Sequence, residues 1–280
     1  MKIQKLSTEE ILNKIDNEIF LEAVQEDYSF MIKIRDYSSY ICTAVHDGHN
    51  FRKSLWANCT HSGYERWYEE DPSTFKMIRS HPVVISGLDS RFEYDLNRDP
   101  ENAIYEDAWG KRLWRNPLSE KERNISLQKH RSFYRVLHAL VDKMHRKQGR
   151  VIVFDMHSYN WRRWDREVPI WNIGTKNIDI GRFGGIAESW RYKLSTMILP
   201  GNIKSTSKIN DTFEGNGFVL KYITQNFEHA LVLATEIAKV YCDEETGVVF
   251  PEVVHAVEEQ LKELMLMQAA EFKNLSYDSR

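Results

Sequence analysis

The sequence predicts an α/β fold: a three-layer sandwich in which helices cover both faces of a mixed, mostly parallel sheet. Short apolar runs that end in polar residues alternate along the chain with longer segments whose apolar residues recur at helical spacing. One run, residues 151–154 (VIVF), is apolar throughout, as is typical of a strand buried on both faces of a parallel sheet. Ligands of such folds bind beyond the carboxyl ends of the strands, so functional residues are expected there.

The chain length and composition fit one domain. With 280 residues and 42% hydrophobic residues, the chain can bury a sizeable core, and α/β folds of this length often form one continuous core. The sequence contains no internal repeat or clear linker. We therefore expect a single α/β domain over residues 1–280.

The elements of this domain follow from local patterns. Ser7, with Glu9 and Glu10 after it, begins a pattern of apolar residues at helical spacing, which predicts an N-terminal helical segment over about residues 7–26. The other expected elements are a strand over 40–45, two β-like runs within 81–98, a long helix over 119–148 that ends at Gly149, a strand from 151 that ends at Asp155 and His157, a strand from 229 to about 235, and a helix over 253–272.

Charge and cysteine usage exclude several classes of protein. The net charge of −3 is spread along the chain, so no basic stripe predicts binding to nucleic acid. Three cysteines, an odd number without CxxC spacing, argue against a disulfide framework and against a cysteine-bound zinc. The N-terminus lacks the apolar core of a signal peptide, and no stretch is long and apolar enough to span a membrane. We expect a cytoplasmic protein without membrane contact.

Two histidines lie at the ends of separate predicted strands. His46 follows the run 40–45, and His157 ends the run that begins at residue 151. Strand ends on one edge of a sheet can converge, and catalytic zinc needs about three protein ligands and an open position. Asp47 and Asp155 lie next to these histidines and are available to orient the imidazole rings. His46 and His157 are therefore candidate metal ligands.

The third ligand stays open at this point. His49 follows His46 by three residues, and an acidic run, Glu69, Glu70 and Asp71, offers carboxylates. We keep both His49 and Glu70 as candidate metal ligands, with Asp71 as a further possibility.

A second group of polar residues lies in the segment SRFEYDLNR. Alternation along a strand would place Arg91 and Asp95 on one face and leave Asn97 and Arg98 in the following turn. The planar guanidinium of arginine binds carboxylates through two hydrogen bonds, which suits the anchoring of an acidic substrate. A structural ion pair of Arg98 with Asp95 or Asp99 is the alternative.

Glu236 stands among apolar residues in LVLATEIAK, where a buried carboxylate without a partner is costly. A general base is one reason for such a residue, because burial raises the pKa of a carboxyl group toward neutrality. An ion pair with Lys239 is the structural alternative.

Taken together, several motifs resemble the N-formylglutamate amidohydrolase family. The similarity runs in order over about residues 40–247, and the DLNR and DxHS motifs are also similar to those of aspartoacylases and zinc carboxypeptidases. This resemblance implies a zinc-carboxypeptidase-like fold. The motifs are AVHDGH, EEDP, SRFEYDLNR, DMHSYN, IGT and TEIAKVYCDE.

The resemblance also implies roles for individual residues. His46 and His157 would bind one Zn²⁺ per chain, and Glu236 would be the general base. Asn97 and Arg98 would hold a substrate carboxylate. The chain departs from the carboxypeptidase-like HxxE pattern, because His49 stands at the glutamate position, so the resemblance leaves His49, Glu70 and Asp71 open as the remaining ligand.

The predicted function is zinc-dependent hydrolysis of the amide bond of a small acidic N-acyl amino acid or related amide. Arg91, or Arg162 or Arg163 after the DMHSYN motif, would stabilise the developing oxyanion or a second acidic group. Two other functions are considered. A metal-free binding module would keep Arg98 for an acidic metabolite, and a metallopeptidase or deacylase would act on a larger peptide in an open groove.

Overall fold

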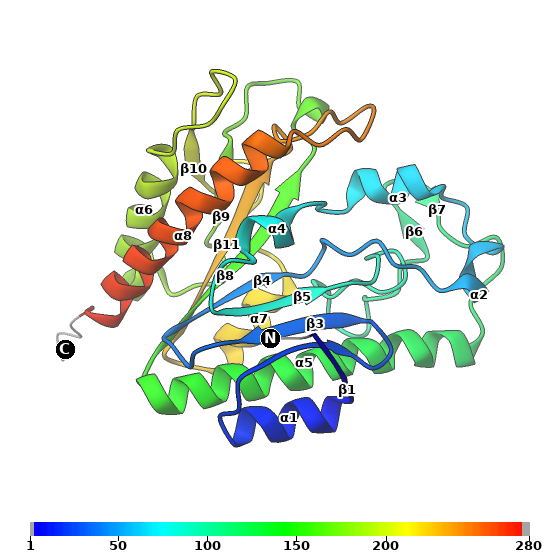
Figure 1. The fold of residues 1–280 in the computed structure, drawn as a ribbon. Helices are drawn as coiled ribbons and strands as arrows, with labels where there is room; N and C mark the ends of the chain where they lie inside the picture. Colours follow the sequence, from blue (N-terminus) through cyan, green and yellow to red (C-terminus); the bar gives the residue numbers. More distant parts are fainter. Residues whose placement is uncertain (1–2, 276–280) are drawn as a thin grey trace.

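One mixed sheet forms the centre of the protein, and the computed structural model describes residues 3–275 (Figure 1). Within these residues nine strands pair in the order β1-β2-β3-β5-β4-β8-β11-β9-β10. A separate hairpin, β6–β7, lies outside the sheet. The strands are β1 Gln4–Leu6, β2 Leu21–Gln25, β3 Phe30–Ile34, β4 Tyr40–Ala44, β5 Val83–Gly87, β6 Asp107–Ala108, β7 Lys111–Arg112, β8 Val151–Tyr159, β9 Trp171–Gly174, β10 Ser207–Ile209 and β11 Ala230–Ala238.

Parallel pairing dominates the middle of the sheet. Strand β8 is parallel to both β4 and β11, and β4 is parallel to β5, whereas β3 and β9 introduce antiparallel pairings on either side. The carboxyl ends of β4, β8 and β11 therefore point to the same edge of the sheet. This edge is where ligands bind in α/β folds.

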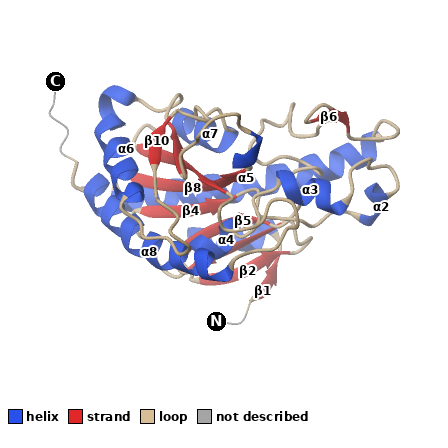
Figure 2. Ribbon diagram, turned by 90° about the horizontal axis from the view of Figure 1, so that it is seen from above, coloured by secondary structure: helices blue, strands red, loops and turns tan. Residues whose placement is uncertain are grey.

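Helices cover both faces of the sheet (Figure 2). Helices α4 and α6 pack against α8 on one face, and α1 and α7 lie against α5 on the other. This arrangement confirms the predicted three-layer sandwich with a mostly parallel mixed sheet. The helices are α1 Thr8–Asp16, α2 Lys53–Trp56, α3 Gly63–Glu69, α4 Thr74–Ile78, α5 Glu120–Gln148, α6 Ile180–Ser195, α7 Phe218–Asn226 and α8 Pro251–Lys273, with a 3-10 turn at Trp161–Arg163.

Aromatic side chains join the layers. Phe154 on β8 packs on Trp190 of α6 with ring centroids 5.1 Å apart, and Phe30 on β3 meets Phe133 of α5 at 5.7 Å. All four side chains are in the apolar core, which extends from Leu6 to Phe272. Burial of such large apolar surfaces is the main stabilising contribution to a fold of this kind.

The long helix α5 has the ends that the sequence predicts. Ser119 accepts a hydrogen bond from the amide of Glu122, whose carboxylate accepts one from the Ser119 amide in return. At the other end Gly149 adopts φ 77°, a left-handed conformation that favours glycine. The predicted helix over 119–148 is therefore confirmed.

Two local predictions were wrong. Helix α1 ends at Asp16 instead of about residue 26, and the following residues 21–25 form β2, in which every second side chain is buried against the core. The break lies at Asn17 and Glu18, where Glu18 has a positive φ of 55° that ends the helix. In the second case, residues 91–93 form a turn and residues 94–95 continue as a loop, so no strand forms there. Pairing of β2 with β1 and β3 overrides the helical pattern in the first case.

No helix among residues 3–275 is long and apolar enough to cross a membrane.

We expect His81 to make the stability of the fold depend on pH. His81 is 1% exposed beside Tyr40, and burial lowers its pKa to about 4. The unfolded chain, with a pKa near 6.5, then takes up the proton first, so stability is complete above pH 6.5 and falls as the pH drops toward 4. The loss attributable to His81 should approach about 3 kcal/mol. Urea unfolding of wild type and His81→Phe at pH 7 and pH 4 measures it, and an equal loss in both proteins would exclude this origin.

Candidate metal centre

The two histidines of the predicted metal site lie together at the carboxyl edge of the sheet. His157 is within β8, and His46 follows the end of β4 by two residues. Their ring centroids are 5.0 Å apart, and both side chains are buried. The parallel pairing of β4 with β8 brings these distant sequence positions together.

Asp71 completes a cluster with these two histidines. Its Oδ2 lies 3.1 Å from Nδ1 of His157 and 3.4 Å from Nδ1 of His46. One ligand atom from each of the three residues lies within 4.8 Å of the others. The Asp71 amide also donates to the backbone oxygen of His46 at 2.9 Å, which fixes this loop against the end of β4.

A carboxylate contacts each histidine ring at the nitrogen that does not face Asp71. Nε2 of His46 lies 2.7 Å from Oδ1 of Asp95, and Nε2 of His157 lies 3.0 Å from Oδ2 of Asp155. In a neutral ring whose N–H is at Nε2, the ionised carboxylate of Asp95 or Asp155 accepts this proton. Nδ1, the nitrogen that faces Asp71, is then free to bind a metal, and carboxylates commonly orient metal-binding histidines in this way.

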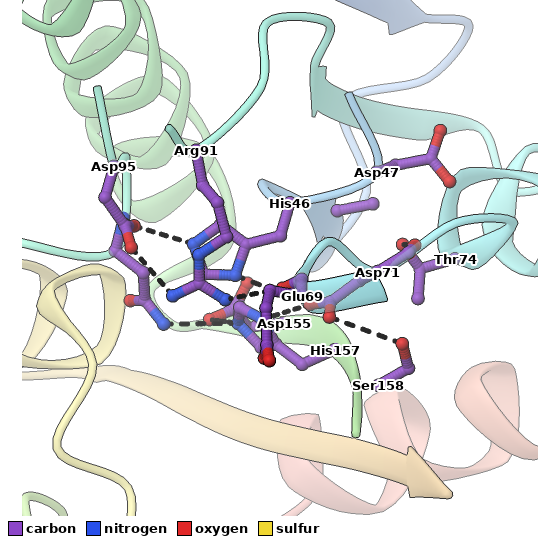
Figure 3. A network of polar contacts seen from close by, with 12 residues as sticks. His46, Asp47, Glu69, Asp71, Thr74, Arg91, Asp95, Asp155, His157 and Ser158 are labelled. Carbon is purple, nitrogen blue, oxygen red and sulfur yellow. Dashed lines mark hydrogen bonds and ion pairs between the residues drawn. The ribbon is translucent and has the colours of Figure 1, made fainter. Parts of the chain in front are cut away.

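Asp95 is itself held in place by two groups. Arg91 donates to Oδ2 of Asp95 at 2.7 Å, and the Tyr105 hydroxyl donates to the same oxygen. Burial alone would raise the pKa of Asp95, but the charge of Arg91 and the His46 ring outweigh it and keep the pKa well below its usual range. Figure 3 shows Arg91 and Asp95 on one side of the two histidines, and Asp71 and Ser158 on the other side.

Strong electrostatic coupling marks the centre of the cluster. Burial lowers the pKa of His157, yet the charge of Asp155 and hydrogen bonds to Asp155 and Asp71 reverse this effect and raise the pKa well above its usual value. Burial would raise the pKa of Asp71, but the hydrogen bonds with His157 and His46 lower it. The site therefore stabilises positive charge between its carboxylates.

The donor set fits zinc. Two imidazole nitrogens and one carboxylate oxygen are typical ligands of a catalytic zinc site, which leaves a fourth position open. All three side chains line a pocket of about 270 Å³, so an open position would face a space that can hold substrate. The other residues lining this pocket include Glu69, Arg91, Asn97, Arg98, Asp155, Tyr159, Asn160, Arg163, Trp164, Phe213, Gly217, Glu236 and Lys239.

His49 and Glu70, the two other proposed ligands, contact each other outside this cluster. Nδ1 of His49 lies 2.5 Å from Oε2 of Glu70, and the Ser90 hydroxyl donates to the other Glu70 oxygen. The His49 side chain is 48% exposed and does not line the pocket. The structure thus brings together Asp71, and not His49 or Glu70, with the two central histidines.

Glu236 lies beside His157 on the same face of the sheet. The two residues are paired in register between β11 and β8, so their side chains point the same way. Among the described residues, no hydrogen bond or ion pair occupies the Glu236 carboxylate, and Lys239 does not pair with it. Burial raises the pKa of Glu236 to about 8, because the charges of Asp71 and Asp155 add to burial and outweigh His157.

Asn97 and Arg98 lie at the mouth of the pocket near α7. The Asn97 backbone oxygen accepts from the Phe218 amide at 3.0 Å, and its Oδ1 accepts from the Val219 amide at 3.2 Å, so Asn97 caps helix α7. Arg98 is exposed and, in the part of the chain that the structure describes, pairs with neither Asp95 nor Asp99. Its guanidinium is therefore available to an anion.

The two remaining arginine candidates differ in position. Arg163 lines the pocket and forms an ion pair with Glu69 at 2.6 Å. Arg162 lies outside the pocket, where it contacts Glu245 at 3.3 Å and covers the Trp161 ring.

Sequence reasoning missed the partner of His46. We expected Asp47 to orient that ring, but the Asp47 carboxylate accepts from the Phe75 amide instead, and Asp95 takes its place. Because residues 91–95 form a turn and a loop, Asp95 folds back onto His46 and Arg91. The position of Asp95 two residues before Asn97, inside the DLNR motif, was the available indication. Lys239, read only as a partner of Glu236, also lines the pocket.

The fold and the site define a class of protein: a three-layer α/β protein with a possible metal site of two histidines and one carboxylate beside a pocket. The family comparison is more specific. A model of the N-formylglutamate amidohydrolase family matches residues 38–240, and the chain belongs to this family. The resemblance expected from the motifs is thus confirmed, and membership implies an amidohydrolase.

Solved structures agree on the fold. An N-formylglutamate amidohydrolase from Ralstonia eutropha JMP134 matches with a TM-score of 0.71 at 16% identity, covering 88% of this chain and 98% of that one. A gene product from Agrobacterium tumefaciens matches with a TM-score of 0.66 at 15% identity, covering 88% and 96%. Comparison with curated proteins gives no significant match.

Asp71→Ala should weaken zinc binding far more than His49→Ala. Loss of Asp71 removes the carboxylate oxygen that lies between the two imidazoles, whereas His49 contacts only Glu70. Loss of a metal ligand should weaken zinc binding more than loss of a residue that only orients a ligand. We therefore expect the affinity for zinc to fall by at least about 100-fold in Asp71→Ala and by less than about 3-fold in His49→Ala. Competition with a chromogenic chelator measures both. The opposite ranking would assign the third ligand to His49.

Proposed function

We propose that this protein is a zinc-dependent amidohydrolase that cleaves the amide bond of a small acidic N-acyl amino acid, with N-formylglutamate as one candidate substrate. Membership of the N-formylglutamate amidohydrolase family supports the reaction type. The observation on which the zinc assignment depends is the convergence of His46, Asp71 and His157 within 4.8 Å at the pocket.

These three residues would hold the metal. When bound, Zn²⁺ would polarise the amide carbonyl and lower the pKa of a water molecule. Asp95 and Asp155 would keep the Nδ1 lone pairs of the histidines directed at the ion, because each accepts the N–H on the far side of its ring.

Glu236 would act as the general base. Its carboxylate has no hydrogen-bond or ion-pair partner among residues 3–275, lines the same pocket as the metal cluster and belongs to a residue paired in register with His157. Burial and the neighbouring carboxylates raise its pKa to about 8, and a bound Zn²⁺ would lower this pKa toward neutrality, where the group can take a proton from water and return it to the leaving amine.

Arg98 would anchor a carboxylate of the substrate. It lines the pocket, and it forms no ion pair with an acidic residue in the described part of the chain. Asn97 would support this role by holding the first turn of α7 at the pocket mouth, and its Nδ2 lies 3.5 Å from Nε2 of His157. Two fixed groups that converge on an acidic ligand select for its charge and its orientation.

Arg91 and Arg163 would have different roles. Arg91 is bound to Asp95, so its first task is to fix that carboxylate, and its position in the pocket wall also places its positive charge near the developing oxyanion. Arg163 would bind a second acidic group of the substrate when Glu69 releases it. Arg162, which lies outside the pocket, has no role in this proposal.

The pocket size supports a small substrate. About 270 Å³ accommodates a small molecule and not an extended peptide, which favours an N-acyl amino acid over a peptide substrate. A metal-free binder would not need a histidine and carboxylate cluster beside an unpaired Glu236.

Cys42, Cys59 and Cys242 are buried and unpaired, which supports a reducing, cytoplasmic setting.

Elemental analysis of the purified protein, combined with a hydrolysis screen of N-formyl and other N-acyl acidic amino acids, tests the proposal directly. We expect close to one zinc per chain and amide cleavage that is lost with a chelator and restored by zinc. A protein that binds no zinc, or cleaves equally well after complete metal removal, would contradict the proposal.

His157→Ala and Glu236→Gln should separate metal binding from catalysis. His157→Ala removes a ligand, so both zinc content and turnover should fall. Glu236→Gln keeps the shape of the side chain but cannot accept a proton, so kcat should fall by about 100-fold or more while zinc content stays at the wild-type level. Zinc loss in both variants would remove the base assignment.

Arg98→Lys should raise KM for acidic substrates by about 10-fold with little change in kcat, because lysine keeps the charge but loses the planar pair of donors. Steady-state kinetics with an acidic substrate and its uncharged amide analogue measures the effect. The increase should be confined to the acidic substrate, and equal KM values for wild type and variant would exclude the anchoring role.

A further inference from the structure

One backbone carbonyl beside the metal cluster accepts hydrogen bonds from two buried side chains that follow the central strands. The Lys239 ammonium and the Asn160 side-chain amide both donate to the backbone oxygen of Tyr68, the latter at 2.8 Å. Lys239 follows β11 by one residue, and Asn160 follows β8 by one residue. The two side chains therefore lie next to each other where the strands end.

The carbonyl belongs to the segment that leads to Asp71, three residues further along the chain. Each part of this segment is bound to the strand ends or to the loop after β5. Arg91 donates to the Glu69 oxygen at 3.3 Å, Ser90 binds the Glu70 carboxylate, and the Asp71 amide donates to His46. Residues 68–71, which are the end of α3 and the loop after it, are thus bound at every residue by the strand ends or by the segment after β5.

Lys239 is an unusual residue for this position. It is 1% exposed and forms no ion pair with a carboxylate within the described residues. Its ammonium lies 5.7 Å from the centre of the Trp67 ring and 5.6 Å from that of Tyr68, so cation–π contacts and one carbonyl compensate its burial. A buried lysine is costly without such partners, and all of these partners lie in residues 67–68.

We infer that Lys239 and Asn160 are positioning residues that fix the loop carrying Asp71 so that its carboxylate meets His46 and His157. This inference rests on the proposed function, because it concerns the assembly of the proposed zinc site. Asp71 lies on a loop, unlike His157, which a central strand holds. Its position therefore depends on contacts such as those at Tyr68, and metal sites lose affinity when a ligand is misplaced.

Three variants test the inference. Lys239→Met keeps an unbranched apolar side chain but removes the ammonium, and Asn160→Ala removes only the second donor to Tyr68. Lys193→Met serves as the matched control, since Lys193 is a half-buried lysine bound to Glu271 on the α6–α8 face, away from the site. Zinc affinity is measured by chelator competition, and the visible spectrum of the Co²⁺-substituted proteins reports the coordination geometry.

We expect zinc affinity to fall by about 10-fold or more in Lys239→Met and by a smaller factor in Asn160→Ala, with altered Co²⁺ spectra and unchanged melting temperatures of the metal-free proteins. Lys193→Met should match wild type in affinity and spectrum. If Lys239→Met is unstable, Asn160→Ala still decides the question.

Wild-type affinity and an unchanged Co²⁺ spectrum in both site variants would overturn the positioning role. A raised KM with unchanged zinc affinity would also overturn it and assign Lys239 to direct substrate contact. Failure of the wild-type protein to bind zinc is a separate result, because it contradicts the proposed function itself.

Discussion

The parallel pairing of β4, β8 and β11 is the constraint on which the site depends. It sends three strand ends to one edge of the sheet, and each end supplies a different part of the chemistry: His46 after β4, His157 in β8 and Glu236 in β11. Register adds precision, since Glu236 pairs with His157 and both side chains share one face. The apolar core and the two helical layers stabilise this arrangement but contribute few of the polar groups that line the pocket.

The balance of charge in the site follows from this convergence. Asp71, Asp95 and Asp155 surround two imidazoles, and Arg91 is the only guanidinium bound to these carboxylates in the described chain. Mutual repulsion of buried carboxylates is costly unless a cation lies among them. These carboxylates favour positive charge on His157, whose pKa they raise well above its usual value despite its burial. A divalent metal would meet the same requirement more completely, since it brings two charges to the same point.

The sequence predicted the residues at strand ends directly, whereas it left open or missed several contacts that depend on loops. His46, His157 and Glu236 were found because apolar runs that stop at polar residues indicate strand ends. The contact of Asp95 with His46 depends on the turn and loop at residues 91–95, where alternating residues suggested a strand, and hydrogen bonds within turns leave no periodic pattern. The helix expected to residue 26 failed for a related reason: pairing of β2 with β3 is a tertiary contact that local spacing does not show.

The same distinction explains why the third ligand stayed open. His49, Glu70 and Asp71 all lie near a histidine in sequence or in a short acidic run, so spacing alone could not rank them. The ranking comes from the loop that follows α3, in which Glu70 faces His49 and Ser90 and Asp71 faces the two central histidines. Side chains in loops have no register to fix them, so hydrogen bonds from Lys239 and Asn160 to a single carbonyl replace the ladder that holds His157. The candidate metal cluster therefore joins one residue within a strand, one residue after a strand and one loop residue, and the position of the loop residue depends on individual side chains.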